Sequence, residues 1–214
     1  MTVQLAISPA SRAFVPGTVP WTSFGADSLP LRFEQDREIF GEGEEADCYY
    51  KVVSGVVRTC KFLSDGRRQI DAFHVAGDVF GIEMGGLYTL SAEAVSDCRV
   101  VAYRRLPFDQ SVPPQLLVQV MRSLNRAQEH AVLLGRRSAV EKVAAFLLDW
   151  ARQSSATGTI ALAMTRQDIG DYLGLTIETV SRTLSLLERD GVIELPSVRQ
   201  IRVKDVEALT DLNG

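Results

Sequence analysis

The sequence predicts an α+β protein in which an N-terminal antiparallel β-roll is joined by a long helix to a C-terminal winged helix-turn-helix. Three observations support this fold class. Short apolar runs punctuated by glycines fill the first part of the chain, an apolar repeat follows, and two amphipathic segments meet at Gly174 near the end. The chain is accordingly divided into a lead-in (1–28), a roll (29–110), a linking helix (113–135) and a helix-turn-helix region (139–214).

The roll is predicted from strand-like segments. YYKVVSGVVRTCKFL and SDCRVVAY are rich in β-branched and aromatic residues, which favour strands. SDGRR, which follows the first of them, has the composition of a hairpin turn. Many short strands at near-regular spacing favour an antiparallel jelly roll. Residues 1–28 are rich in Ser, Pro and Gly and predict a loosely structured lead-in.

A long helix is predicted to begin at Pro113 and Pro114, because proline can open a helix but not sit inside one. Its apolar positions alternate spacings of three and four, the period of a two-stranded coiled-coil seam. This stripe consists of Leu117, Val120, Leu124, Ala127, Ala131 and Leu134. One amphipathic helix packed on its own roll would also need an apolar face. The strict period favours a homodimer through this helix.

The segment Thr165–Ile193 predicts a helix-turn-helix. Its apolar positions at helical spacing are Ile169, Leu173, Val180 and Leu184. Gly174 marks the turn, Gly170 is small where the two helices approach, and Thr176 stands where an N-cap belongs. Ahead of this segment, an apolar helical face predicts the core of the same region: Val143, Phe146, Leu147 and Trp150.

Glu178, Ser181 and Arg182 share one face near the N-terminus of the second helix, the end that a recognition helix inserts into the major groove. Arginine pairs with guanine, glutamate accepts from the cytosine amino group, and serine contacts base or phosphate. The same cluster would also suit an ordinary solvated face. VIELPSVRQIRV predicts a β-hairpin wing with Pro196 and Ser197 at its turn.

Composition gives no sign of a nucleic-acid partner, since the formal net charge is −4. From residue 139 onward, 8 Lys and Arg face 11 Asp and Glu. Attraction to phosphates must therefore come from individual side chains. The candidates for contact with the DNA backbone are Thr165, Arg166, Thr176, Thr179, Arg199 and Arg202. For Arg199 and Arg202, ordinary surface charge is an equally good interpretation.

No apolar run is long enough to span a bilayer, and the N-terminus lacks the pattern of a secretory signal. We therefore expect no membrane partner. Cys48, Cys60 and Cys98 are odd in number and show no CxxC spacing. They predict reduced, structural thiols in a cytoplasmic protein.

The string GLTIETVSR resembles the recognition segment of the CRP/FNR superfamily of bacterial transcription regulators. Its Glu-x-x-Ser-Arg pattern resembles the FNR and FixK branch, whose members read TTGAT-type half-sites. The cyclic-AMP receptor branch carries arginine and glycine where this chain has Ile177 and Ser181. The segments GEGEEADCYYKVVSGVVR and AGDVFG resemble the superfamily's sensor domain, a cyclic-nucleotide-binding-like jelly roll. The resemblance implies a homodimer on palindromic double-stranded DNA.

The effectors used in this superfamily each demand particular residues. Leu90 occupies the position of the family's phosphate-binding arginine, so no cyclic AMP is expected. Residues 1–47 lack the cysteines of an FNR-type iron–sulfur cluster, whose distant fourth ligand aligns with Val101. Haem needs an axial ligand such as His or Cys, and the histidines that the chain offers are His74 and His130. We therefore expect no cofactor and no metal. The alternative to a regulator without an effector is an effector-gated regulator, which senses haem-borne NO or CO, or another small ligand, through the roll.

A metalloenzyme of cupin type needs clustered histidines, and this roll has only His74. The sequence therefore predicts no catalytic residues and no enzyme activity. The FixK resemblance instead implies control of microoxic or anaerobic respiration or of nitrogen-fixation genes. It also implies contact with RNA polymerase, for which the candidates are Ser64, Asp65 and Arg67 in the predicted hairpin turn. A plain hairpin turn explains these three residues equally well. The redox-reactive cysteine of some FixK-like proteins corresponds here to Thr165.

Overall fold

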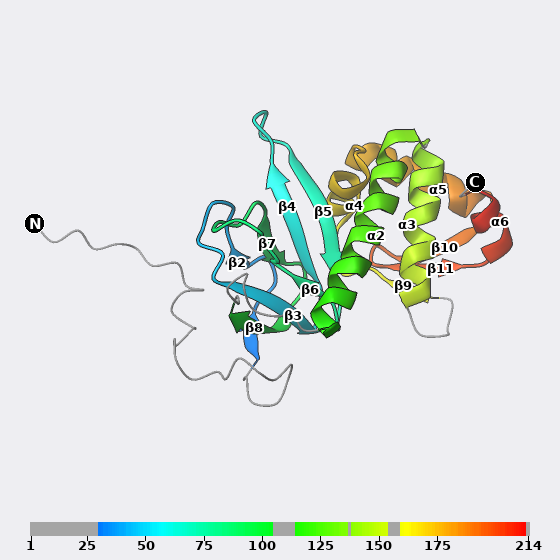
Figure 1. Ribbon diagram of the computed structural model, residues 1–214. Coiled ribbons are helices and arrows are strands. Elements are labelled where there is room, and N and C mark those ends of the chain that lie inside the picture. The colour runs from blue at the N-terminus through cyan, green and yellow to red at the C-terminus, as the bar shows by residue number, and fades with distance from the viewer. Residues whose placement is uncertain (1–29, 105–113, 137, 154–158, 213–214) are drawn as a thin grey trace, which may run out of the picture. The chain divides into compact units, whose positions relative to one another are not determined.

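The computed structural model describes residues 30–104, 114–136, 138–153 and 159–212 (Figure 1). The predicted lead-in over residues 1–28 lies outside this range. The chain separates into two compact units. The first contains the residues up to Lys61 and Asp71–Val120, and the second contains Phe62–Ile70 and Met121–Gly214. The tip of one long hairpin therefore belongs to the second unit.

Two four-stranded sheets make up the roll, with strand orders β1-β8-β3-β6 and β2-β7-β4-β5 (Figure 1). The strands are β1 Leu31–Phe33, β2 Glu38–Phe40, β3 Cys48–Ser54, β4 Val57–Phe62, β5 Arg68–His74, β6 Val79–Phe80, β7 Ser91–Ala94 and β8 Cys98–Arg104. The pairs β1–β8, β3–β8, β3–β6, β2–β7 and β4–β7 are antiparallel. The predicted antiparallel roll is confirmed.

Alternating apolar side chains fill the roll. Val57, Ala92 and Val100, which lie on three different strands, are fully buried in one apolar cluster with Phe40 and Tyr88. Their burial on strands from both sheets shows that the two sheets share one core, as a roll requires. Removing this apolar surface from water is the main favourable contribution to folding.

The predicted turn at SDGRR closes the β4–β5 hairpin. Leu63 N–H donates to Arg67 O at 2.8 Å, and Gly66 N–H donates to Leu63 O at 2.9 Å. Asp65 caps the turn by accepting from Arg67 N–H at 3.0 Å. The turn holds Ser64, Asp65 and Arg67 at an exposed tip.

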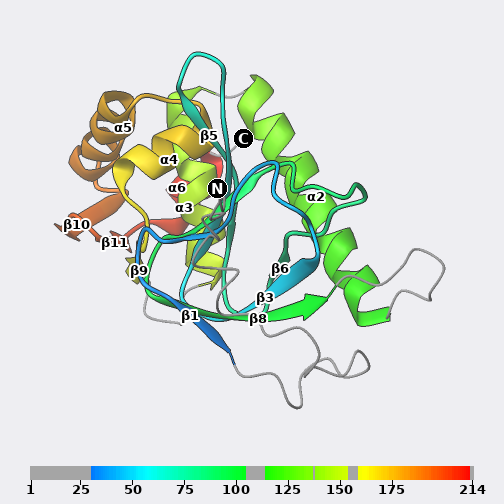
Figure 2. The ribbon, with the colours of Figure 1, turned by 90° about the vertical axis from the view of Figure 1, so that its left-hand side faces the viewer.

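The helix predicted after Pro113 is α2, Pro114–Arg136. It is followed by α3, Ala139–Gln153, whose predicted core positions Val143, Phe146, Leu147 and Trp150 are all buried. The remaining elements are β9 Thr159–Ala161, α4 Arg166–Leu173, α5 Ile177–Arg189, β10 Ile193–Ser197, β11 Gln200–Val203 and α6 Val206–Asp211. Strands β10, β11 and β9 form a three-stranded sheet in that order. Figure 2 shows α4 and α5 side by side, with the β10–β11 hairpin directly after α5.

Candidate nucleic-acid interface

Helix α4, the first helix of the helix-turn-helix, begins at a capping box. The Thr165 hydroxyl accepts from Asp168 N–H at 3.1 Å, and the Asp168 carboxylate accepts from Thr165 N–H at 2.9 Å. These two bonds satisfy backbone donors that the first turn of a helix leaves unpaired. The Thr165 hydroxyl also donates to Asp168 Oδ2 at 2.8 Å. The only proton of the Thr165 hydroxyl is thus donated within the cap. Thr165 therefore serves as a helix cap, and this proton is not free for a DNA phosphate.

The turn between α4 and α5 depends on two glycines. Gly174 ends α4 in the left-handed conformation, with φ 63° and ψ 40°, which glycine adopts at little steric cost. Gly170 lies where the chain passes closely, since a Cβ there would stand 2.7 Å from Leu175 O. The predicted roles of Gly174 at the turn and of Gly170 at the close approach are both confirmed.

Helix α5 begins at the predicted N-cap. The Thr176 hydroxyl accepts from Thr179 N–H at 3.2 Å and lies 3.1 Å from the Thr179 hydroxyl. The buried face of α5 consists of Val180, Thr183, Leu184 and Leu187. Because that face packs inward, the first two turns project Glu178 and Arg182 into solvent, and Ser181 beside them is half-buried. The structure thus brings the three predicted base-reading residues together on one accessible surface.

The electrostatics of this surface favour an ionised Glu178. Its pKa lies below the ordinary value, mainly because the carboxylate accepts a hydrogen bond from its own backbone N–H at the start of the helix. The Thr176 hydroxyl and the charge of Arg182 lower the pKa further. Glu178 is therefore a hydrogen-bond acceptor at neutral pH, the form needed to receive a cytosine amino group.

The wing is present, but the position predicted for its turn was wrong. Pro196 and Ser197 belong to β10, and the turn is formed by Val198 and Arg199. Proline has no N–H to pair, and the β10–β11 register shifts between Glu194 and Ser197, so the strand accommodates Pro196 through an irregularity. Pro196 therefore lies in an irregular strand and not in the turn of the wing.

The basic backbone candidates differ in their surroundings. Arg199 is exposed at the tip of the wing. Arg202 is exposed and pairs with Glu194, with 2.8 Å between Nη1 and Oε2. Arg166 is half-buried, and its Nε has no hydrogen-bond partner within the described residues. Arg199 thus presents its charge most openly, and Arg202 would have to exchange Glu194 for a phosphate.

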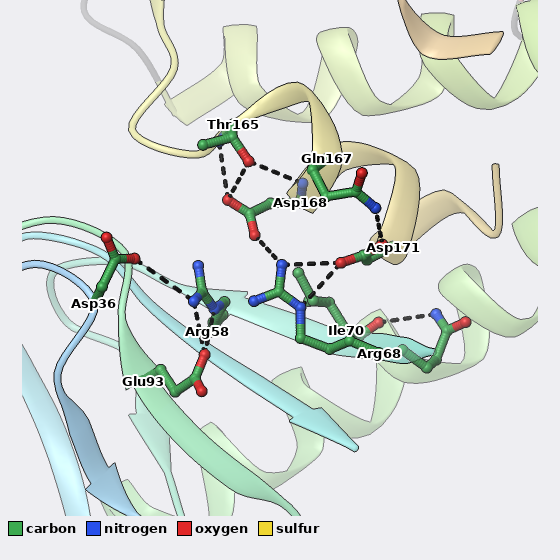
Figure 3. A network of polar contacts seen from close by, with 10 residues as sticks. Asp36, Arg58, Arg68, Ile70, Glu93, Thr165, Gln167, Asp168 and Asp171 are labelled. Atoms are coloured by element: carbon green, nitrogen blue, oxygen red, sulfur yellow. Dashed lines mark hydrogen bonds and ion pairs between the residues drawn. The ribbon is translucent and has the colours of Figure 1, made fainter. Parts of the chain in front are cut away.

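The residues that hold α4 in place are not among those predicted from the sequence. Arg68, from the start of β5, lies between Asp168 and Asp171 of α4 (Figure 3). At the other end of α4, His130 Nε2 lies 2.8 Å from Tyr172 O, and Lys142 Nζ donates to Leu173 O at 3.1 Å. The Thr-x-x-Asp capping box could have been found in the sequence. The partners from β5, α2 and α3 are distant in the chain and leave no local signal.

Helix α2 exposes most of its predicted seam. Leu117 is 55% and Leu124 is 47% exposed, and Ala127 and Ala131 are exposed as well. Val120 and Leu134 are half-buried. The exposed large apolar side chains of α2 thus coincide with positions of the predicted seam.

The interior of the roll is occupied by stacked aromatic rings. Phe40 and Tyr88 stack with centroids 3.7 Å apart, and Tyr50 and Phe80 lie 5.6 and 6.0 Å from Phe40. The Tyr88 hydroxyl donates to Cys48 O at 2.6 Å, which fixes this ring in place. The cluster is a mainly apolar core in which the buried Tyr88 hydroxyl has a hydrogen-bond partner.

Residues retained from the family's phosphate-binding motif make internal contacts. The buried Ser91 hydroxyl accepts from Glu42 N–H at 2.9 Å. Glu83 accepts from the N–H and the hydroxyl of Thr89 at 2.9 and 2.8 Å. Leu90, at the arginine position, is half-buried. These side chains support the loop that contains them.

The two histidines also have defined neighbours. His74 Nε2 lies 3.1 Å from the Thr59 hydroxyl, and His130 stacks on Tyr172 with 4.0 Å between ring centroids. Because a carbonyl oxygen can only accept, the bond to Tyr172 O requires that His130 Nε2 carry a proton. Across the residues that the structure describes, no group of three or more His, Cys, Asp and Glu could hold a metal ion.

Two further findings concern the whole described chain. Cys48, Cys60 and Cys98 are buried, and none of them forms a disulfide. None of the helices described is both long enough and apolar enough to cross a membrane.

Comparison with known families assigns both parts of the chain. Residues 30–112 match the cyclic nucleotide-binding domain, and residues 141–212 match the Crp-like helix-turn-helix domain. The first match agrees with the antiparallel roll and the second with the capped helices α4 and α5. The predicted α+β fold class is confirmed.

Individual relatives narrow the assignment. The nitrogen fixation regulation protein FixK of Azorhizobium caulinodans is 50% identical over 196 residues, which are 86% of this chain and 79% of that protein. The transcriptional activator protein FnrL of Cereibacter sphaeroides is 33% identical, over 85% of this chain and 79% of its own length. The solved structure of FixK2 from Bradyrhizobium japonicum has a TM-score of 0.82 at 44% identity and covers 88% of this chain and 98% of that one. The chain therefore belongs to the CRP/FNR family as a FixK-like, DNA-binding transcription regulator, and it is not an enzyme.

Proposed function

We propose that the protein binds palindromes of the TTGAT-N4-ATCAA type as a homodimer, without a small-molecule effector. The observation that carries this proposal is the common exposed face of Glu178, Ser181 and Arg182 at the capped start of α5. A helix presented in this way can enter the major groove with its N-terminal residues against the base edges.

Each of the three side chains has a chemical role in this proposal. Arg182 donates a bidentate pair to guanine O6 and N7, and the ionised Glu178 accepts from the cytosine amino group. Ser181 contacts a base or a phosphate. Arg199 and Arg202 on the wing contact phosphates, which fix the position of the helix without reading sequence. Arg166, Thr165, Thr176 and Thr179 are the remaining backbone candidates, with both Thr165 and Thr176 also serving as helix caps.

The dimer forms through α2. The exposed Leu117 and Leu124 would be buried against a second copy of the helix, and the exposed Ala127 and Ala131 let the two backbones approach closely. Burial of each large apolar side chain contributes about 1.5–3 kcal/mol. A two-fold dimer places its recognition helices about 34 Å apart, one turn of DNA, which is why the proposed site is a palindrome.

The proposal that no effector is needed rests on the roll. A cyclic nucleotide phosphate needs a cation, and Leu90 supplies none. The rings of Phe40, Tyr50, Phe80 and Tyr88 pack against one another inside the roll. In this proposal the stacked rings fill the interior of the roll and serve as a scaffold in place of a ligand site. Regulation would then act on the amount of the protein.

The regulated genes are proposed from the relatives. One of them is named a nitrogen fixation regulation protein, and others are named anaerobic regulatory proteins. We therefore assign this chain to genes of microoxic or anaerobic respiration or of nitrogen fixation. Ser64, Asp65 and Arg67, at the exposed β4–β5 tip, are the proposed contacts with RNA polymerase.

Stoichiometry on DNA tests the proposal. Analytical ultracentrifugation of the purified protein with a full TTGAT-N4-ATCAA duplex should show two chains per duplex. A duplex with one scrambled half-site should bind far more weakly, because one recognition helix loses its base contacts. One chain per full palindrome, or equal affinity for both duplexes, would contradict the dimeric arrangement. Leu124→Glu, which places a charge in the seam, should give monomers that bind weakly.

A further inference from the structure

The helix that precedes the recognition helix is tied to the tip of the β4–β5 hairpin by three charged groups. Arg68 Nε donates to Asp171 Oδ2 at 2.9 Å, and Arg68 Nη2 pairs with Asp168 Oδ1 (Figure 3). Asp168 and Asp171 are three residues apart in α4 and share one face of the helix. The side chains of Arg68, Asp168 and Asp171 are 17%, 3% and 12% exposed, so all three charges are largely removed from water.

This ion pair reaches the start of α4 through Asp168. One carboxylate oxygen of Asp168 accepts from the backbone and the hydroxyl of Thr165, and the other oxygen faces Arg68. Asp171 also accepts from Gln167 Nε2 at 2.6 Å. Arg68 thus touches the same carboxylate that closes the capping box. Its guanidinium fork can serve two carboxylates at once, which a lysine cannot do in the same geometry.

The next residue of the hairpin reaches the other end of α4. Gln69 Nε2 donates to Tyr172 O at 3.4 Å, next to the shorter contact from His130. Beyond Tyr172 the chain turns directly into α5, and Leu175 N–H donates back to Gly170 O at 2.9 Å. Since the turn is short and bonded to α4, any shift of α4 is passed to Glu178 and Arg182.

We propose that Arg68 is a positioning residue for DNA recognition, which seats α4 and thereby sets the orientation of the recognition helix without touching DNA. Without Arg68, two neighbouring buried carboxylates lose the cation that both of them contact, which is strongly unfavourable. Helix α4 would relieve it by moving the carboxylates toward water. The inference rests on the proposed DNA-binding role of α5. Arg68 also directly follows Ser64–Arg67, so it links the proposed polymerase contact to α4, the helix that precedes the recognition helix.

The test compares Arg68→Ala and Arg68→Lys with wild-type protein. Lys61→Ala is the matched control, because it removes an exposed cation of the same hairpin whose partner is Glu42 at 2.8 Å. On the TTGAT-N4-ATCAA duplex, Arg68→Ala should bind about tenfold more weakly, within the range that side-chain networks transmit. Arg68→Lys, which keeps the charge but loses the fork, should fall between Arg68→Ala and wild type. Lys61→Ala should bind as the wild type does.

The salt dependence of binding separates positioning from a direct phosphate contact. A lost phosphate contact lowers the slope of log affinity against log salt by about 0.9 for each charge. If Arg68 only positions α4, Arg68→Ala keeps the wild-type slope. A slope reduced by one charge, or an affinity equal to that of wild type, would overturn the proposal.

Hydrogen exchange in the free protein tests the same contact without DNA. Arg68→Ala should speed exchange in Arg166–Leu173 and leave the amides of Ala139–Gln153 as protected as before. If Arg68→Ala leaves the exchange rates of α4 unchanged, the positioning role of Arg68 is wrong, whatever the protein's affinity for DNA. If the wild-type protein does not bind the duplex, the proposed half-site is wrong, and this result says nothing about Arg68. Asp171→Asn is a milder variant should Arg68→Ala not fold. On its own it should weaken DNA binding by less than Arg68→Ala does, because it weakens the same contact and keeps the cation.

Discussion

Gly170 and Leu175 meet backbone to backbone in the turn of the helix-turn-helix. A Cβ at position 170 would stand 2.7 Å from Leu175 O, while Leu175 N–H donates to Gly170 O at 2.9 Å. A backbone oxygen held in this turn cannot rotate away as a flexible side chain could. The close approach of α4 to the turn therefore requires glycine, and it couples the two helices that present the base-reading residues.

Replacing Gly170 tests this coupling. Gly170→Ala should lower the free energy of unfolding by about 1–3 kcal/mol, because the added methyl group forces the backbone apart. DNA binding should weaken with it. Urea denaturation measures the first effect. Gly85→Ala is the control, since a Cβ there has nothing within 4 Å and should change stability by less than about 0.5 kcal/mol.

Replacing Arg182 tests the base contact to guanine. Arg182→Ala should reduce affinity by about 1–3 kcal/mol and relax discrimination at one base pair of each half-site. Competition among duplexes that each carry one altered base pair measures this. Arg189→Ala removes an exposed arginine from the far end of α5, where it neighbours Asp190. Arg189→Ala should keep the wild-type discrimination among the duplexes. If Arg182→Ala instead lowers the affinity for every duplex by the same factor, Arg182 contacts a phosphate and not a base.

The charge of Glu178 makes a prediction about pH. A carboxyl whose pKa lies below its ordinary 4.5 stays ionised as the pH falls from 7 to 5.5, and its contribution is lost only at lower pH. Discrimination at the cytosine position should therefore be equal at pH 7 and pH 5.5. Glu178→Gln, which has no proton to gain, should show weaker discrimination at both values. Discrimination that disappears by pH 5.5 would show that the carboxyl titrates in that range.

The buried cysteines should be unreactive. Burial raises the pKa of Cys48 and of Cys98 from 9.0 to about 11, so almost no thiolate exists at neutral pH. Alkylation of the native protein at pH 7.5 should be far slower than in denaturant. Because the pKa of both thiols is raised in the folded state, their burial in the neutral form also affects stability. The contribution of the neutral thiols to the free energy of unfolding is complete below pH 9 and is lost as the pH rises through 11. Rapid native alkylation that abolishes DNA binding would instead reveal a thiol switch.

The exposed hairpin tip should act in transcription and not in DNA binding. Asp65 and Arg67 pair with each other, with 2.7 Å between Nε and Oδ2, and the tip is exposed. Asp65→Ala and Arg67→Ala together should leave the affinity for DNA unchanged and reduce transcription from a target promoter in vitro. Equal transcription by the double variant and wild type would leave the tip as a plain hairpin turn.

Local patterns predicted much of this molecule. The period of apolar residues located α2 and α5, and the cap at Thr176 and the turn at Gly174 were both readable from residue type. The predicted position of the wing turn was wrong because proline occurs both in turns and in bulged edge strands, and Pro196 lies in the latter. Arg68 could not be foreseen. It meets Asp168 across 100 positions of sequence, and a single cation among charged residues carries no pattern that identifies its partner.

In the proposed function, α5 reads a TTGAT half-site and the protein needs no effector. Binding of the purified, effector-free protein to a TTGAT-N4-ATCAA duplex and to a TGTGA-type palindrome, each at about 0.15 M salt, tests it most directly. We expect tight binding to the first duplex and only non-specific affinity for the second. Preference for the TGTGA palindrome would contradict the assignment of Glu178, Ser181 and Arg182, and specific binding to neither would contradict the absence of an effector.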